Sequence, residues 1–148
     1  MEVLIVLAIL SIVIGIALPS YREHQKRIAI ADTAKDLAVI SQRLEKYYSL
    51  NSRYPDDLAA INSDNMVDPY GRAYFYRNLT GGGGNDEEGG GGLPTIRTDS
   101  SGTVLNTDYD LFSAGYDGEY TAKISSNTSK DDIVRGKNGK FINLAESY

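Results

Sequence analysis

Residues 1–21, MEVLIVLAILSIVIGIALPSY, decide the fold of this chain. Between residues 3 and 18 there is no charged side chain, and only Ser11 and Gly15 interrupt the aliphatic run. Those sixteen residues predict a helix of roughly 24 Å, because an α-helix rises ~1.5 Å per residue. A bilayer core is about 30 Å thick and needs ~20 apolar residues. The run is therefore a few residues short of a comfortable membrane span.

Two residues of this stretch are unusual for a plain apolar helix. Glu2 places a carboxylate at the apolar end, where an ionised group costs several kcal/mol unless it finds a partner. Pro19 stands seventeen residues after Glu2, and its ring lacks the N–H that a helix interior uses. Together with Gly15, Pro19 is expected to loosen the helix locally.

This opening resembles the N-terminus of type IV pilins and of the pseudopilins of type II secretion. Mature chains of that superfamily carry a glutamate near the N-terminus, an unbroken aliphatic helix, and a proline seventeen residues after the glutamate. Residues 2–9, EVLIVLAI, read like that opening. The glutamate is usually the fifth residue of the mature chain, whereas here it is the second. Two interpretations stay open: the given chain starts about three residues late, or Met1 is a real mature start.

Two other interpretations of the apolar stretch also stay open. A secretory signal peptide has a basic N-terminal region and a shorter apolar core, but the first ionisable side chain here is that of Glu2. A plain single-span anchor requires neither the glutamate nor the proline. The combination favours a helix that assembles with copies of itself.

The second part of the long helix is amphipathic. Its apolar and small residues recur at alternating steps of four and three, which lines one helical face. The members of this face are Ile30, Ala34, Leu37, Ser41, Leu44 and Tyr48. We therefore expect one helix over residues 2–49. Residues 1–24 would form its transmembrane or filament-core half, and residues 25–148 would form the amphipathic half plus a globular head.

The remaining residues are enough for one small domain with an acidic surface. The chain has 148 residues, so the helix leaves roughly a hundred for the head. A net charge of −5 disfavours nucleic acid as a directly bound partner, because phosphate binding needs clustered Lys and Arg. The chain has no cysteine and so no disulfide. Many surface pilins close the C-terminal region with a disulfide and major pseudopilins generally use calcium, so the resemblance leans toward pseudopilins.

Several segments of the head carry local structural signals. Residues 67–76, VDPYGRAYFY, join an Asp-Pro-Tyr-Gly turn to an aromatic strand at 73–76, and they resemble a signature of the major pseudopilins. Residues 81–92, GGGGNDEEGGGG, are expected to form a flexible exposed loop. The other expected elements are a short helix at 56–61, strands near 95–98 and at 108–113, and two final strands around the Asn138-Gly139 hairpin signal.

Residues 108–118, DYDLFSAGYDG, resemble a second stretch of the major pseudopilins, in which this loop and a downstream acidic pair hold calcium. By that resemblance the ligands here would be the Ala114 carbonyl and the carboxylates of Asp117, Asp131 and Asp132. Such hard oxygens suit calcium. The span from Asp117 to Asp131 is about twice the usual length, so the loop either bulges away or has lost the ion, leaving solvated aspartates.

The resemblance implies an α+β, pilin-like fold, with the long helix packed on a small antiparallel sheet. It implies a major pseudopilin, held in the bacterial inner membrane before assembly and then polymerised into a periplasmic filament that drives protein export. Its implied partners are identical subunits, an inner-membrane assembly platform, a prepilin peptidase and minor pilins. Glu2 would pair with a neighbour's N-terminal amine, while Pro19 and Gly15 let the helix stretch.

Two alternative functions stay open, and catalysis is not expected. The chain could be the major subunit of an extracellular type IV pilus for adhesion, motility or DNA uptake. It could instead be a membrane-anchored calcium-binding module that never polymerises. No nucleophile–base pair, metalloprotease motif or phosphate loop occurs in the sequence, and the one histidine, His24, reads as a solvated helix residue.

Overall fold

A single long helix and a four-stranded sheet make up this chain, seen here in a computed structural model that describes residues 2–81 and 95–148. For Glu2 and residues 15–20 the structure describes the backbone alone. The expected glycine-rich loop at 81–92 therefore lies, from residue 82 on, outside the described residues.

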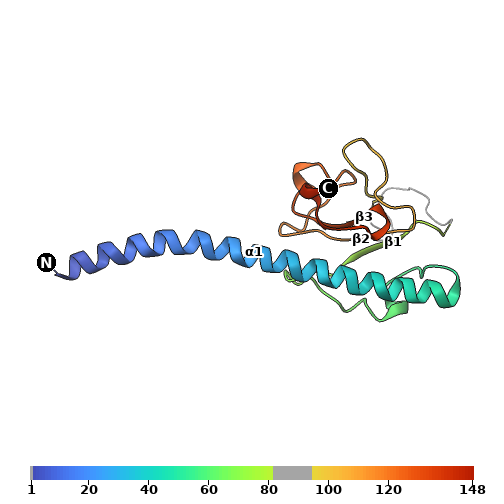
Figure 1. Cartoon of the computed structure of the whole chain (residues 1–148), viewed down its shortest axis with the longest axis horizontal. Coiled ribbons are helices and arrows are strands. Elements are labelled where there is room, and N and C mark those ends of the chain that lie inside the picture. The colour runs from blue at the N-terminus through green and yellow to red at the C-terminus, as the bar shows by residue number, and fades with distance from the viewer. Residues whose placement is uncertain (1, 82–94) are drawn as a thin grey trace.

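The helix α1 (Glu2–Asn51) runs without interruption for 50 residues. Figure 1 shows the N-terminal half of this helix projecting away from the head, and the C-terminus of the chain lying in the head. The backbone stays helical through Gly15 and Pro19, so the helix is not broken where we expected it to be loosened. The helix ends two residues later than expected, at Asn51; Ser52 then takes a φ of 56°.

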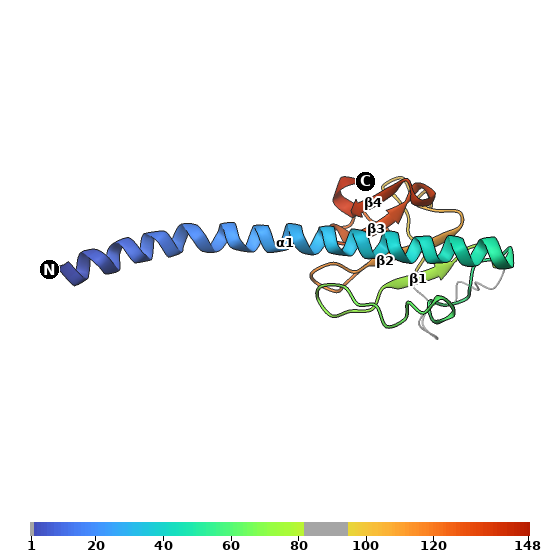
Figure 2. The same cartoon turned by 60° about the horizontal axis from the view of Figure 1, so that its bottom comes forward.

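The four strands form an antiparallel meander in the order β1-β2-β3-β4. They are β1 (Phe75–Asn78), β2 (Tyr109–Ser113), β3 (Ile133–Gly136) and β4 (Phe141–Leu144). Figure 2 shows the strands passing behind the C-terminal half of α1. The α+β class, a long helix packed on an antiparallel sheet, is thereby confirmed.

The sheet is covered on both faces, because neighbouring strand residues point to opposite sides. Tyr109 and Leu111 pack with Leu37 and Leu44 of α1 in one core cluster. Phe112 belongs to a second cluster on the other side of the sheet. The burial of all five residues of β2 follows from this arrangement.

The amphipathic face of α1 is confirmed where it meets the sheet. Leu37, Ile40 and Leu44 have no exposed surface, and Ile30 and Ala34 pack against the same cluster. At 25 cal/mol per Å², full burial of one such aliphatic side chain stabilises the fold by about 1.5–3 kcal/mol. This half of the helix is therefore an integral part of the head.

The strand predictions were good for the end of the chain and poorer for its middle. The hairpin around Asn138-Gly139 is confirmed by β3 and β4. The strand expected at 108–113 is β2, whereas the one expected at 73–76 is β1, two residues further on. Residues 95–98 contribute only isolated bridges at Thr98, and the helix expected at 56–61 is the short 3-10 turn Ala59–Ile61.

The lengthened span between Asp117 and Asp131 packs into the head. Ile124 is 2% exposed and belongs to the second core cluster. Its amide donates to the Thr98 carbonyl at 2.9 Å, and the Thr98 amide donates to Ala122 at 2.8 Å. The span is thus tied to the segment before β2, so of the two alternatives left open for it, the one in which it bulges away is not found.

Candidate functional site

The projecting half of α1 exposes aliphatic side chains in every direction. The large aliphatic residues between positions 3 and 14 are 50–71% exposed: Val3, Leu4, Ile5, Val6, Leu7, Ile9, Leu10, Ile12, Val13 and Ile14. A helix that is apolar on all sides is normally surrounded by apolar material on all sides. Among the described residues, no helix combines the length and the hydrophobicity that crossing a membrane requires.

The polar group inside this apolar segment is satisfied by the helix itself. The Ser11 hydroxyl lies 2.8 Å from the Leu7 carbonyl and 2.9 Å from the Ala8 carbonyl, to which it donates. Ser11 therefore presents no unpaired donor to whatever surrounds the segment. For Glu2, Gly15 and Pro19, the three expected assembly residues, the structure describes the backbone alone.

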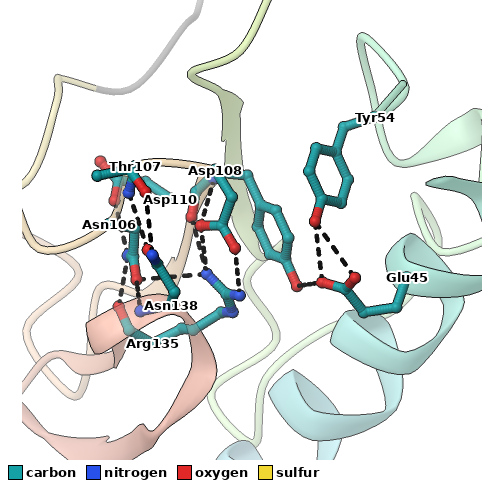
Figure 3. Close-up of polar contacts among 9 residues, drawn as sticks. Glu45, Tyr54, Asn106, Thr107, Asp108, Asp110, Arg135 and Asn138 are labelled. Atoms are coloured by element: carbon teal, nitrogen blue, oxygen red, sulfur yellow. Dashed lines mark hydrogen bonds and ion pairs between the residues drawn. The ribbon is translucent and has the colours of Figure 1, made fainter. Parts of the chain in front are cut away.

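Glu45 joins the other half of α1 to the sheet. Its carboxylate accepts the hydroxyl of Tyr54 at 3.1 Å (Figure 3) and that of Tyr109 at 3.3 Å. Burial raises the pKa of Tyr109 to about 12, and the nearby Glu45 charge acts in the same direction. Both phenols therefore stay protonated and keep donating to Glu45 at physiological pH.

Arg135 on β3 lies beside Tyr109 and binds several polar groups of the head. Its guanidinium forks onto Asp108, with nitrogen–oxygen distances of 2.8 and 2.7 Å, and it stacks 3.8 Å from the centroid of the Tyr109 ring. Burial acts to raise the pKa of Asp108, but the bonds from Arg135 hold it below its ordinary value. Asp108 therefore stays ionised and paired.

Asn106 connects Arg135 to the buried acid of β2. Its amide nitrogen donates to Asp110 and to the Arg135 carbonyl, both at 2.9 Å, and its oxygen accepts the Asn138 amide at 3.0 Å (Figure 3). The other oxygen of Asp110 accepts the Arg97 amide at 2.8 Å. Burial raises the pKa of Asp110. These bonds link β2, β3 and the segment before β2.

The expected calcium ligands do not gather at one point. Asp132 is fully buried and forms an ion pair with Arg97, whereas Asp117 is exposed and accepts the Glu119 amide at 2.8 Å. The Ala114 carbonyl accepts the Gly118 amide at 3.0 Å. In the described part of the chain, no group of three or more acidic, His or Cys side chains lies together as a metal site requires.

The polar atoms near these ligands give calcium little support. One oxygen of Asp132, Oδ1, has no hydrogen-bond partner among the described residues, but Arg97 already neutralises that carboxylate. Asp131 accepts the backbone amides of Tyr116 and Asp117 at 2.7 and 3.2 Å. Calcium binding by Ala114, Asp117, Asp131 and Asp132 remains a prediction from the resemblance.

The arginines were missed by sequence reasoning. Arg97 and Arg135 are 1% and 3% exposed, although arginine is normally a surface residue. Their partners stand 35 and 27 residues away in the sequence. The available signal was the set of aspartates in strand-like surroundings at 108, 110 and 132, since a buried carboxylate needs a cation.

Comparison of the chain with models of protein families, with curated proteins and with solved structures gives no match.

Proposed function

We propose that this chain is a filament-forming structural subunit. The observation that carries this proposal is the projecting half of α1, whose ten large aliphatic side chains between residues 3 and 14 are each at least 50% exposed. Soluble proteins rarely leave an apolar area of this size uncovered, so it marks a surface that binds something else. A groove on a partner would cover one side of the helix only, whereas lipid or a bundle of like helices covers every side.

The two halves of α1 would have different roles: one anchors the helix to the head, and the other is free to contact other chains. The half that contacts the sheet is locked by core packing and by the bonds of Glu45. The projecting half is then held at a defined angle to the head, so that copies of the chain can stack their helices with their heads outward. Such a subunit has a mechanical role and no catalytic one.

We propose more specifically a major pseudopilin of a type II secretion system. The subunit would wait in the bacterial inner membrane, be processed by a prepilin peptidase, and be built by an inner-membrane platform into a periplasmic filament with minor pilins. This choice is supported by residues 67–76 and 108–118, which carry the resemblance, and by the absence of cysteine. The pilin-like fold belongs to this proposal. The rival, an extracellular type IV pilus, would display abundant filaments on the cell surface at native expression.

Glu2 provides the experiment that tests assembly. An acid at the end of an apolar helix is penalised unless a neighbour supplies a positive charge, so Glu2→Ala should abolish or strongly slow filament formation and leave membrane association intact. Glu23→Ala is the matched control, because Glu23 lies on the same helix, is exposed, and contacts Arg27 at 3.5 Å.

The measurement is electron microscopy of filaments, with membrane fractionation of the same cells. Filaments from the Glu23→Ala chain and none from the Glu2→Ala chain support the proposal. Normal filaments from Glu2→Ala would remove the assigned role of Glu2. Intact chains that stay solitary in lipid, whatever stands at position 2, would instead support the membrane-anchored module that never polymerises.

A further inference from the structure

Loop 114–118 lies between two charged side chains of opposite sign. Arg72 contacts its carbonyl oxygens, and Asp131 contacts its amides. Neither side chain belongs to the loop, and Arg72 comes from the turn before β1. The loop is thus held by one cationic and one anionic side chain from other parts of the chain.

The guanidinium of Arg72 engages two carbonyls at once. Nη1 donates to the Gly115 carbonyl at 2.6 Å, and Nη2 donates to the Tyr116 carbonyl at 3.1 Å. A planar guanidinium can make such a two-pronged contact, whereas a lysine ammonium is a single point charge. Backbone carbonyls are also the oxygens that a calcium ion would use. Arg72 therefore supplies positive charge where a bound cation would.

Asp68 holds the backbone of Arg72 in place. One oxygen of the buried Asp68 carboxylate accepts the amides of Tyr70 and Arg72, at 2.9 and 3.0 Å. The other oxygen accepts the hydroxyl of Ser113 at 2.7 Å, at the end of β2. The Asp68 carboxylate thus joins the turn at 68–72 to the end of β2, where the loop starts, without help from the Arg72 guanidinium.

The opposite side of the loop is closed by Asp131. Its Oδ2 accepts the amides of Tyr116 and Asp117, so this carboxylate oxygen is used inside the protein. Gly115, with a φ of 60°, passes so close to the Asp131 backbone that a Cβ there would collide with its carbonyl. At Gly118, where φ is 76°, a Cβ would lie 2.6 Å from Nε of Arg72. Both approaches need glycine.

We propose that the guanidinium of Arg72 occupies the cation position of loop 114–118, so that the chain closes this loop with its own side chain and without a metal ion. The position is a carbonyl-rich site that would accept a hard divalent cation once the guanidinium is removed. This proposal does not depend on filament assembly.

The test compares the full-length chain with Arg72→Ala, Arg72→Lys and the control Arg53→Ala, each dispersed in detergent micelles. Arg53 is exposed and lies outside the turn and the loop. Thermal melts are recorded with millimolar calcium and with EDTA. Terbium luminescence gives a separate binding readout, since Tyr70 and Tyr116 meet with ring centroids 5.6 Å apart beside the loop and would sensitise a bound lanthanide.

We expect the unsubstituted chain and Arg53→Ala to melt at the same temperature with calcium and with EDTA, and to give no sensitised terbium emission. Arg72→Ala should melt about 5–10 °C lower in EDTA, because two charge-assisted hydrogen bonds are lost. Calcium should restore part of that shift, and terbium emission should appear. Arg72→Lys should fall between the two, because an ammonium can replace the charge and not the fork.

Three results would overturn the proposal. One is a fall in the melting temperature of the unsubstituted chain on addition of EDTA, which would mean that the loop holds a metal ion as it stands. The others are an Arg72→Ala chain that melts like the unsubstituted one, or one that responds neither to calcium nor to terbium. If Arg72→Ala does not fold, the EDTA comparison and the Arg72→Lys chain still decide the question.

Discussion

Arg97 and Asp132 form an ion pair in the interior of the head, with side chains 1% and 0% exposed. Arg97 also lies 4.4 Å from the centroid of the Phe112 ring and donates to the Thr121 carbonyl at 2.7 Å. The pair thereby connects the segment before β2, the lengthened span between Asp117 and Asp131, and the residue that leads into β3. Because each charge is buried, each is costly without the other.

Removing one partner of this pair should strongly destabilise the head. Asp132→Ala leaves the Arg97 guanidinium buried without its carboxylate, so we expect the free energy of unfolding to fall by about 3–5 kcal/mol. Asp117→Ala should change it by less than about 1 kcal/mol, because Asp117 is exposed. Urea unfolding followed by circular dichroism measures both. A loss below about 1 kcal/mol for Asp132→Ala would show that the pair does not stabilise the head.

The stability of the head should rise on mild acidification. Burial raises the pKa of Asp132 from 3.8 to about 6, although Arg97 acts in the opposite direction. Between those values the folded chain holds a proton that the unfolded chain has released, so the free energy of unfolding increases as pH falls from about 6 to about 4. Asp110, whose pKa burial also raises, adds in the same direction. Urea midpoints over this range measure the slope.

Asp108 limits how far acidification can stabilise the head, because its protonation lowers the free energy of unfolding. Its folded pKa lies below the ordinary value, so its contribution is present above about pH 4 and is lost as pH falls further. Asp132→Asn should flatten the slope between about pH 6 and 4, because the titrating group is gone. An unchanged slope in that variant, or midpoints that fall steadily on acidification, would contradict the assignment to Asp132.

Glu45 should be worth more to the fold than an exposed acid of the same helix. Glu45→Ala removes the acceptor of two largely buried phenols, Tyr54 and Tyr109, so we expect a loss of about 1–3 kcal/mol. The pKa of Tyr109, raised to about 12 by burial with Glu45 adding to the rise, should also fall. Chemical denaturation and an ultraviolet titration of the tyrosines measure the two effects. Equal losses for Glu45→Ala and the control Glu23→Ala would contradict the role of Glu45.

A charge in the projecting half of α1 should abolish association without affecting the head. Leu7 is 57% exposed, so Leu7→Lys removes no core contact and should leave the melting temperature within about 2 °C. In a bundle of like helices, however, the ammonium would be buried without a partner. Filament formation, scored by electron microscopy, should be lost.

The matched control for that variant is Leu50→Lys. Leu50 is 75% exposed at the other end of the same helix, beside the head. We expect this chain to assemble normally, because position 50 lies outside the apolar segment. Filaments from Leu7→Lys as abundant as those from Leu50→Lys would mean that the apolar segment does not form the filament core.

The sequence alone determined the elements whose signals are local. Helix α1 followed from an apolar run and then a repeat of four and three, and the final hairpin followed from an Asn-Gly pair between two apolar segments. The turn at Asp68 was also readable, because Asp, Pro and Gly each have a specific turn role. In all three cases the residues that cause the structure are neighbours along the chain.

The tertiary structure alone decided which charges are buried and with what. Arg72, Arg97 and Arg135 reach partners 24 to 44 residues away, and no spacing rule connects residues at such separations. It also decided that Asp132 turns inward to Arg97 while its neighbour Asp131 faces the loop. Asp131 lies in the turn before β3 and is half-buried, whereas Asp132 is fully buried and a buried carboxylate needs a cation, so one acidic pair is divided between the loop and the protein interior.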